Sequence, residues 1–366
     1  MISFNRRTLF KASLAASAVA TLSGCSLLRG TTQSGPGQLA GAVGLPDGTF
    51  AISAIDLQGR QLWQAPVESR CHSGCTRPSS NELLFVERRP GWSFYVFNIH
   101  TGERLHHIKA EGGEHFVGHG IFSPGGDYLY VPANRYEQGE GIVAVYDSQQ
   151  NYKRVKTLEL KGIGPHQLVM HPDGQTLIVA LGGILTHPDY DRIKLNLDTM
   201  KPALILMDRN SGEILARFAP SHHQLSCRHV DVSPGGNIYA AYQYQGPRYE
   251  TRPLVARYRG GQYEEIDFGH EVLAELGNYI ASVVAHPEND LVALASPIGG
   301  TALIFEGSSG RIVSKTRIKD CAGAEALPGG DFLISSGQGE LIHLSAHRSP
   351  VELARMPLHW DHHLVL

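Results

Sequence analysis

Residues 118–151 read GHGIFSPGGDYLYVPANRYEQGEGIVAVYDSQQN and contain both signals that decide the fold. A short apolar run ends in the turn Ser123–Gly126 (Ser-Pro-Gly-Gly), and a later run ends in the looser turn Asp147–Asn151. Between the turns lie Leu129–Val131 and Ile142–Tyr146, which are rich in residues that favour strands. Turns of these two kinds join antiparallel strands, so the segment predicts consecutive hairpins.

Both turn signals recur along the chain. The prolines of the first signal lie about 40 to 60 residues apart, at Pro78, Pro124, Pro172, Pro234, Pro287 and Pro328. The second signal, an acidic or amide residue followed by a glycine turn, recurs at Asp56–Arg60, Asn98–Glu103, Asp208–Glu213 and Glu306–Arg311. A period of about 40 to 50 residues with four short strands per repeat is typical of a β-propeller blade.

The two ends of the chain indicate how the ring closes. Residues 40–67 contain a hairpin and its flanking strands without an innermost strand, and Asp361–Leu366 form a strand after the seventh repeat. We therefore predict an all-β fold, a seven-bladed β-propeller over residues 38–366 whose C-terminal strand completes blade one. An eight-bladed ring and two stacked sandwiches are the alternatives. The longest interval holds an insertion, residues 181–202, which we expect to lie as a loop over one face.

The first 25 residues predict an export signal. Arg6, Arg7 and Lys11 precede an apolar stretch that is too short to cross a bilayer. The arginine pair resembles a twin-arginine signal, and Leu22–Cys25 resembles a bacterial lipobox, which would place a lipid anchor on Cys25. A plain secretory signal with an incidental cysteine is the alternative. With residues 26–37 as a flexible tether, we expect a periplasmic protein that touches the membrane only through this anchor.

The composition excludes one class of partner and leaves catalysis open. Hydrophobic residues make up 42% of the chain, which is enough for a core, and 32 basic against 35 acidic residues give a net charge of −3. No basic field for nucleic acid is present. The sequence contains no nucleophile elbow, zinc-protease helix or phosphate-binding glycine loop. Whether the protein is an enzyme is therefore not decided by any motif.

Histidines recur at the predicted entrances of the innermost strands. In four repeats a histidine precedes the blade proline by five or six residues, and a fifth, His362 or its neighbour His363, begins the closing strand. The candidates are His72, His119, His166, His229 and His362. Innermost strands line the axis of a propeller, so these imidazoles predict a centre for a transition metal such as iron or copper. The alternative is that they satisfy main-chain groups at a crowded channel mouth.

Two further expectations concern the chemistry of this centre. With an ordinary histidine pKa, metal binding should weaken as the pH falls through about 6 to 6.5. Cys71, Cys227 and Cys321 each stand seven residues before a blade proline and are additional candidate ligands. Together with Cys75 they could instead form disulfides in an oxidising compartment, with three connectivities that the sequence does not distinguish.

Several motifs carry a resemblance to a known family. They are Gly118-His-Gly-x-Phe-Ser123, Gly162-Ile-Gly-Pro-His-Gln-Leu168, Gly182-Gly-Ile-x-Thr-His-Pro-Asp189, Leu195-Asn-Leu-Asp-Thr-Met200 and Arg228-His229. Over essentially the whole mature chain, the sequence resembles an uncharacterised family of twin-arginine-exported periplasmic propellers. Members often accompany imelysin-type iron-uptake lipoproteins and a dihaem thiol-oxidoreductase-like protein. More remotely, the blades are similar to those of quinoprotein amine dehydrogenase and of the haem d1 domain of nitrite reductase.

The resemblance and the histidines together suggest a function. We expect a periplasmic accessory of iron or other transition-metal acquisition that binds a metal or a metal cofactor at the channel mouth, with an iron-uptake lipoprotein as partner. One alternative is a non-catalytic scaffold that docks a partner lipoprotein through the propeller face and residues 181–202. The other is a hydrolase or dehydrogenase of unknown substrate.

Overall fold

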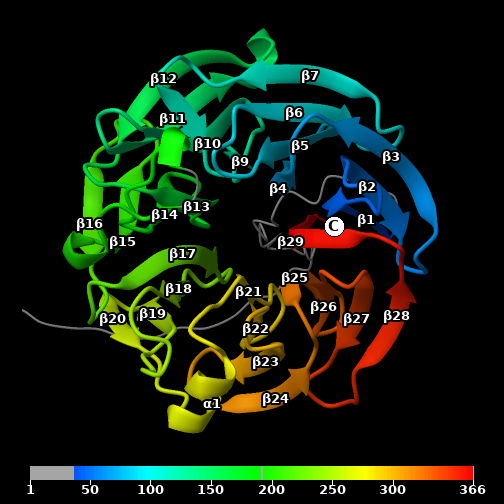
Figure 1. The fold of residues 1–366 in the computed structure, drawn as a ribbon, viewed down its shortest axis with the longest axis vertical. Helices are drawn as coiled ribbons and strands as arrows, with labels where there is room; N and C mark the ends of the chain where they lie inside the picture. Colours follow the sequence, from blue (N-terminus) through cyan, green and yellow to red (C-terminus); the bar gives the residue numbers. More distant parts are fainter. Residues whose placement is uncertain (1–36, 191–192, 366) are drawn as a thin grey trace, which may run out of the picture.

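The computed structural model describes residues 37–190 and 193–365. In this part of the chain, seven antiparallel sheets surround a central axis like the blades of a propeller (Figure 1). The predicted all-β, seven-bladed fold is confirmed, and the eight-bladed ring and the stacked sandwiches are excluded. The predicted export signal, Cys25 and tether residues 26–36 lie outside the described residues.

The first three blades show the common order of strands, from the axis outward. Blade one contains β29 (His359–Val365), β1 (Gln38–Gly44), β2 (Phe50–Asp56) and β3 (Gln61–Val67). Blade two contains β4 (Cys71–Thr76), β5 (Glu82–Glu87), β6 (Ser93–Asn98) and β7 (Arg104–Lys109). Blade three has an interrupted inner strand, β8 (Glu114–Phe116) and β9 (Ile121–Phe122), followed by β10 (Tyr128–Arg135), β11 (Glu140–Asp147) and β12 (Lys153–Glu159).

The other four blades repeat this order. Blade four contains β13 (Pro165–Met170), β14 (Thr176–Leu181), β15 (Ala203–Asp208) and β16 (Ile214–Phe218). Blade five contains β17 (Leu225–Val232), β18 (Ile238–Tyr244), β19 (Val255–Arg259) and β20 (Gln262–Glu265). Blade six contains β21 (Ser282–Ala285), β22 (Leu291–Ser296), β23 (Thr301–Glu306) and β24 (Ile312–Arg317). Blade seven contains β25 (Cys321–Leu327), β26 (Asp331–Ser336), β27 (Glu340–Leu344) and β28 (Val351–Arg355).

Helical segments are few and short. The helix α1 (His270–Glu275) lies in the connection between blades five and six. The 3-10 turns η1 (Ser148–Gln150), η2 (Pro188–Tyr190) and η3 (Leu197–Thr199) lie in other connections. Among the described residues, no helix has the length and apolar character that crossing a bilayer requires.

The C-terminal strand closes the ring as the sequence predicts. β29 pairs with β1 through Val43 and Trp360 and through Gly41 and Leu364. Trp360 is buried, and a Cβ added at Gly41 would lie 2.9 Å from its indole ring. The glycine therefore leaves the space in which the last strand packs. Joining the two ends of the chain in one sheet removes the free edges of an open ring.

The repeated turns have the structures that their residues favour. Gly126 N–H donates to the Ser123 carbonyl (2.8 Å) in the turn that leads from the inner strand of blade three to β10. In the turn between β15 and β16, Asp208 Oδ1 accepts hydrogen bonds from the N–H groups of Asn210 (3.0 Å) and Ser211 (2.6 Å). Main-chain N–H groups in a turn do not pair with a neighbouring strand, and these side-chain hydrogen bonds give them partners instead.

Register shifts occur in the inner strands at the positions of the histidines. The pairing of β4 shifts between Cys71 and Ser73, that of β13 between Pro165 and Leu168, and that of β17 between Cys227 and His229. β29 is irregular between Trp360 and Leu364, and blade three is interrupted between β8 and β9. A bulge or break changes the direction of a side chain, which allows histidines to face the axis from an otherwise regular blade.

Candidate metal centre

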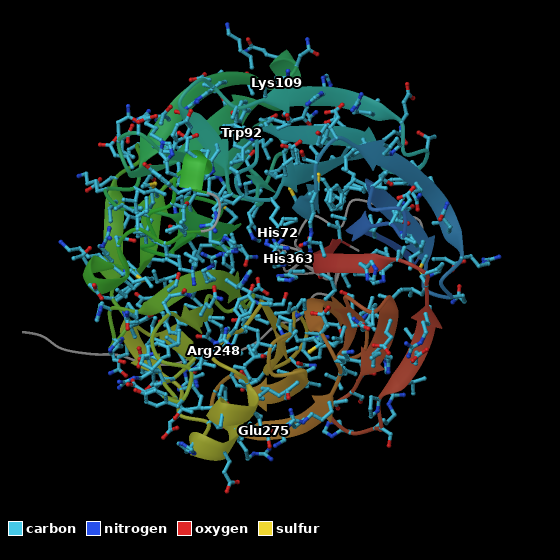
Figure 2. All side chains as sticks on the ribbon, viewed as in Figure 1. His72, Trp92, Lys109, Arg248, Glu275 and His363 are labelled. Atoms are coloured by element: carbon cyan, nitrogen blue, oxygen red, sulfur yellow. The ribbon has the colours of Figure 1, made fainter. Side chains whose placement is uncertain are left out.

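Six histidine rings from five consecutive blades meet at the propeller axis. They are His72, His119, His166, His229, His362 and His363. Neighbouring ring centroids lie 4.7 to 5.9 Å apart, and Figure 2 shows His72 and His363 next to each other at the axis. The structure thus brings together all five histidines that the sequence selected, and it adds His363, which the sequence offered only in place of His362.

The nitrogen atoms of these rings form overlapping groups of a size that suits a metal ion. The groups are His72, His119 and His363; His119, His166 and His229; and His72, Asp361 and His362. Within each group the candidate ligand atoms lie within 4.8 Å of one another. His119 belongs to both all-histidine groups, and His72 links the first group to the carboxylate-containing one. The three groups therefore form a chain in which neighbours share one ligand.

Two hydrogen bonds fix how the rings present their nitrogens. His72 Nδ1 lies 2.6 Å from Asp361 Oδ1, and His229 Nδ1 lies 3.2 Å from Gln167 Oε1. An oxygen in this position accepts the Nδ1 proton, so the Nε2 lone pair is left for another ligand. Carboxylate and carbonyl oxygens hold metal-bound histidines in this way.

Three of the inward nitrogens are buried and unpartnered. Nε2 of His119, of His229 and of His363 has no hydrogen-bond partner in the described structure. Buried polar atoms in proteins are nearly always paired, because an unpaired one costs the free energy of its lost hydration. The alternative that the histidines satisfy main-chain groups does not account for these atoms. The three residues belong to the two all-histidine groups, so these atoms are candidate metal ligands.

Burial keeps the imidazoles neutral. It lowers the pKa of His72, which Asp361 offsets only in part, and it lowers the pKa of His362 to about 3. Burial, followed by the charges of neighbouring histidines or of Arg228, lowers the pKa of the remaining rings well below the ordinary value, namely His119, His166, His229 and His363. Neutral imidazole is the form that binds metal. The expected loss of metal binding through pH 6 to 6.5 rests on an ordinary pKa, and the lowered pKa values move this expectation to a lower pH.

Asp361 supplies the negative charge of the centre. Burial alone would raise the pKa of this carboxyl, but His72 and Arg88 outweigh burial and hold its pKa well below the usual range. Arg88 Nη1 lies 3.2 Å from Asp361 Oδ2, and Arg70 Nε also donates to this oxygen. Asp361 is therefore an ionised carboxylate that already has two arginine partners and one histidine partner.

Gly118 leaves the space for His72. Its φ of +101° is one that side chains rarely adopt, and an added Cβ would lie 2.7 Å from His72 Cδ2. The Gly118 carbonyl also accepts a hydrogen bond from Ser73 N–H (3.0 Å), which ties blade three to blade two beside the histidine. The Gly-His-Gly motif thus orients His119 and makes room for the ring of the neighbouring blade.

Replacing Gly118 with alanine should lower the free energy of unfolding by about 1 to 3 kcal/mol, the usual cost of a strained backbone conformation. It should also displace His72 and weaken metal binding. Urea unfolding and Co²⁺ titration of the variant measure the two effects. Gly112→Ala is the matched control, because a Cβ there meets no atom within 4 Å. Equal behaviour of the two variants would contradict this role for Gly118.

The cysteines lie apart from the groups of candidate ligands. Cys71, Cys227 and Cys321 are buried in the hydrophobic contacts between blades. All three, and Cys75, are free thiols, so none of the three disulfide connectivities forms. Burial raises the pKa of Cys227 and of Cys321 to about 12, which favours the thiol over the metal-binding thiolate. The equal spacing of Cys71, Cys227 and Cys321 from a proline predicts equal heights along the propeller axis. It does not predict where their side chains point.

The described part of the 181–202 insertion contacts blades two, three and five. Thr186 Oγ1 of the insertion lies 3.4 Å from the guanidinium of Arg89 in blade two. The Leu197 carbonyl of the insertion lies 3.5 Å from Nε2 of Gln224, which directly precedes blade five. An aromatic row continues from the insertion through His187 and Tyr136 to Trp92. The expectation of a loop over one face therefore agrees with these contacts.

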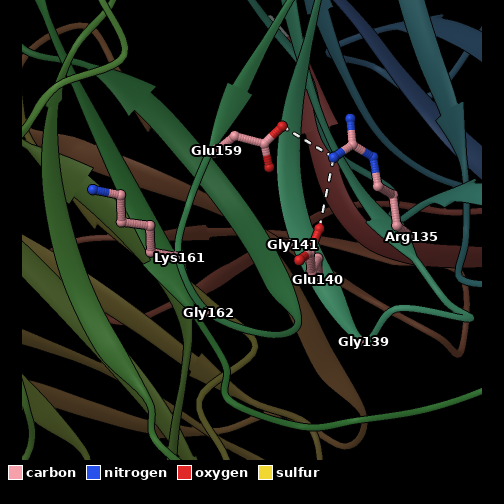
Figure 3. A pocket seen from close by; sticks show the side chains of 7 residues that line it. All are labelled: Arg135, Gly139, Glu140, Gly141, Glu159, Lys161 and Gly162. Atoms are coloured by element: carbon pink, nitrogen blue, oxygen red, sulfur yellow. Dashed lines mark hydrogen bonds and ion pairs between the residues drawn. The ribbon is translucent and has the colours of Figure 1, made fainter.

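A separate hollow lies on the rim between blades three and four (Figure 3). Arg135 in this hollow pairs with Glu159 (3.0 Å) and Glu140 (3.7 Å), as the dashed lines show. The charges of Arg135, Glu140 and Glu159 are thus partnered with one another. It lacks the converging unpartnered atoms of the axial centre, so we place the candidate site at the axis.

Sequence reasoning missed three residues of the centre. Asp361 and Gln167 orient histidines, and Arg228 lies beside His166 and His229, whose pKa values it lowers. A signal existed for Asp361, since Asp-His-His occupies the closing strand. Gln167 and Arg228 are direct neighbours of predicted histidines, but only the bulges of β13 and β17 decide which side chain faces the axis.

The fold and the site define a class of protein, a β-propeller with a buried polyhistidine centre at its axis. The chain belongs to the DUF1513 family, proteins of unknown function, whose model matches residues 65–366. No curated protein sequence matches the chain. Among solved structures it is similar to Kuenenia stuttgartiensis hydrazine synthase, with a TM-score of 0.61 and 15% identity over 85% of this chain and 94% of that one. At this identity the likeness shows the fold alone.

Proposed function

We propose that this chain is an exported protein that holds a transition-metal ion, iron or copper, in its axial histidine centre. One observation carries the proposal: three buried Nε2 atoms, those of His119, His229 and His363, are unpartnered among six neutral imidazoles. A metal ion in either all-histidine group would lie beside two of these three residues, because one group contains His119 and His363 and the other contains His119 and His229. Imidazole suits iron, copper, zinc and nickel, and the absence of a thiolate from the groups of described ligand atoms favours these over purely sulfur-bound metals.

The chain of shared ligands suits a protein that accepts an ion and passes it on. An ion in the His119, His166 and His229 group can move to the next group while it remains bound to His119. It can then reach Asp361 and His362 through His72. Each move exchanges some ligands and keeps one. This property supports a role as a periplasmic accessory of transition-metal acquisition, with a periplasmic iron-uptake lipoprotein as the partner that receives or delivers the ion.

Metal content of the native protein tests the proposal. Protein purified from the periplasm without added metal should contain at least one transition-metal ion per chain by elemental analysis. Changing His119, His229 and His363 together to alanine should remove this metal. Changing three exposed histidines, His100, His223 and His270, to alanine should leave it in place. A wild-type protein that is metal-free and binds no added Cu²⁺, Co²⁺ or Zn²⁺ would refute the function.

A scaffold for a partner lipoprotein is the second candidate. Large apolar side chains are exposed on and near the insertion, with Trp92 44%, Tyr190 54% and Ile193 60% exposed. Exposed apolar groups of this size in one region favour protein contact. The same elemental analysis separates the candidates, because the scaffold needs no metal and would keep its partner in the triple histidine variant.

A further inference from the structure

Arg228 is a half-buried cation next to His229 of the histidine centre. It occupies the bulge of β17 between Cys227 and His229. Its Nε atom is buried and has no hydrogen-bond partner, and the side chain forms no ion pair within residues 37–190 and 193–365. A buried nitrogen of a cation left without a partner is costly, so the position of Nε favours a negative group that these residues do not provide.

The groups around Arg228 add to the positive charge. Burial lowers the pKa of Arg228, Tyr279 opposes this, and Arg88 lowers it further. Lys194 from the insertion is exposed and donates to Gln245 Oε1, and desolvation, followed by the charges of Arg228 and Arg89, lowers its pKa. The carboxylate of this region, Asp361, is already bonded to Arg70, Arg88 and His72. Tyr279 can donate from its hydroxyl, which lies 3.4 Å from His362 Nδ1.

The charges do not balance when a metal ion is added. The six imidazoles are neutral ligands, so they leave the full charge of the ion in place. Arg228, whose Nε is buried, then repels the ion with little screening by water. An anion bound between the metal and Arg228 would remove both the repulsion and the unpaired guanidinium.

We propose that the centre binds its metal ion together with an anionic oxygen ligand that Arg228 holds against the metal. This inference rests on the proposed metal site for its ion, and it names the form of the cargo: a metal carried as an anionic carboxylate complex. Guanidinium suits carboxylate and phosphate oxygens alike, through paired N–H groups. A free inorganic oxyanion is therefore the other source of the same chemistry, and the test separates the two.

The test measures Co²⁺ binding at a fixed free Co²⁺ concentration, with citrate, with inorganic phosphate and with neither. In the wild-type protein, citrate should tighten the apparent Kd at least tenfold and change the visible spectrum of the bound ion. In Arg228→Gln this gain should fall below twofold. Binding of Co²⁺ without an added anion should stay equal or become several-fold tighter in the variant, because a repelling charge is gone.

Arg248→Gln is the matched control, since Arg248 is exposed and lies away from the axis (Figure 2). It should behave as the wild type does, and Arg228→Lys should keep part of the gain.

A phosphate gain equal to that of citrate supports the anion site and assigns it to an inorganic oxyanion. Weaker binding of Co²⁺ alone in Arg228→Gln would mean a structural role and would overturn the inference, as would a citrate gain that survives this change. Co²⁺ binding without any anion effect in the wild type overturns only the inference, whereas no Co²⁺ binding under any condition overturns the metal function.

Discussion

Lowering the pH from 7.5 to 5.0 should remove most of the folding stability of the metal-free protein. In the folded chain burial lowers the pKa of all six central histidines, that of His362 to about 3. In the unfolded chain these residues titrate near an ordinary pKa of about 6.5. Below that pH the unfolded chain binds protons that the folded chain does not, so the free energy of unfolding falls as the pH falls.

The expected size of this effect is large. Each such histidine contributes at most about 1.4 kcal/mol per pH unit, so six contribute up to about 8 kcal/mol per unit well below pH 6.5. The whole stability of a typical domain is about 5 to 15 kcal/mol. Above about pH 7 the imidazoles are neutral in both states and the effect vanishes. Urea unfolding of the metal-free protein at pH 7.5, 6.5, 5.5 and 5.0 measures the slope.

A variant with fewer central histidines provides the control. His119→Gln combined with His363→Gln removes two of six titrating groups, so the pH slope should fall by about a third. A urea midpoint that does not change between pH 7.5 and 5.5 would show that the rings titrate normally. Zn²⁺ affinity adds an independent measure, because rings that stay neutral when folded should give nearly the same Kd at pH 7.5 and 5.5.

The propeller was predictable because its determinants are local. Proline and glycine turns such as Ser123–Gly126 recur about every 40 to 60 residues, and each fixes the ends of two strands. Ring closure was also predictable, since a missing first strand and a surplus last strand have one simple solution. The histidines stand at a regular distance from these turns, so their meeting at the axis was predictable as well.

The direction and environment of the side chains were not predictable. Cys71 and His72 are neighbours, yet the shift in β4 leaves one between blades and turns the other to the axis. Spacing from a proline gives height along the axis and says nothing about this rotation. The lowered pKa of the histidines likewise follows from how many rings share one buried space, which depends on five blades at once. The pairing of Asp361 with His72 joins residues from opposite ends of the propeller sequence.

Replacing His119 with alanine should weaken metal binding about a thousandfold, more than any other single histidine change. His119 is a member of both all-histidine groups, so its loss leaves intact only His72, Asp361 and His362. A four-ligand protein site of about 10 to 16 kcal/mol implies roughly 3 to 4 kcal/mol per ligand, or two to three powers of ten in affinity. His362→Ala is the matched comparison, because it disturbs only the group with the carboxylate, and it should cost tenfold or less.

Stability separates a ligand from a residue that merely supports the fold. His119→Gln should weaken Co²⁺ or Zn²⁺ binding nearly as much as the alanine change, while the metal-free variant becomes less sensitive to acid because one buried imidazole is gone. If His119 had only a structural role, its loss would lower the free energy of unfolding at every pH. The amount of metal bound would then fall only as far as the amount of folded protein falls. Isothermal titration at pH 7.5, paired with urea unfolding at pH 7.5 and 5.5, gives both quantities. Equal metal affinities of the His119 and His362 variants would contradict the role of His119 as a ligand that two groups share.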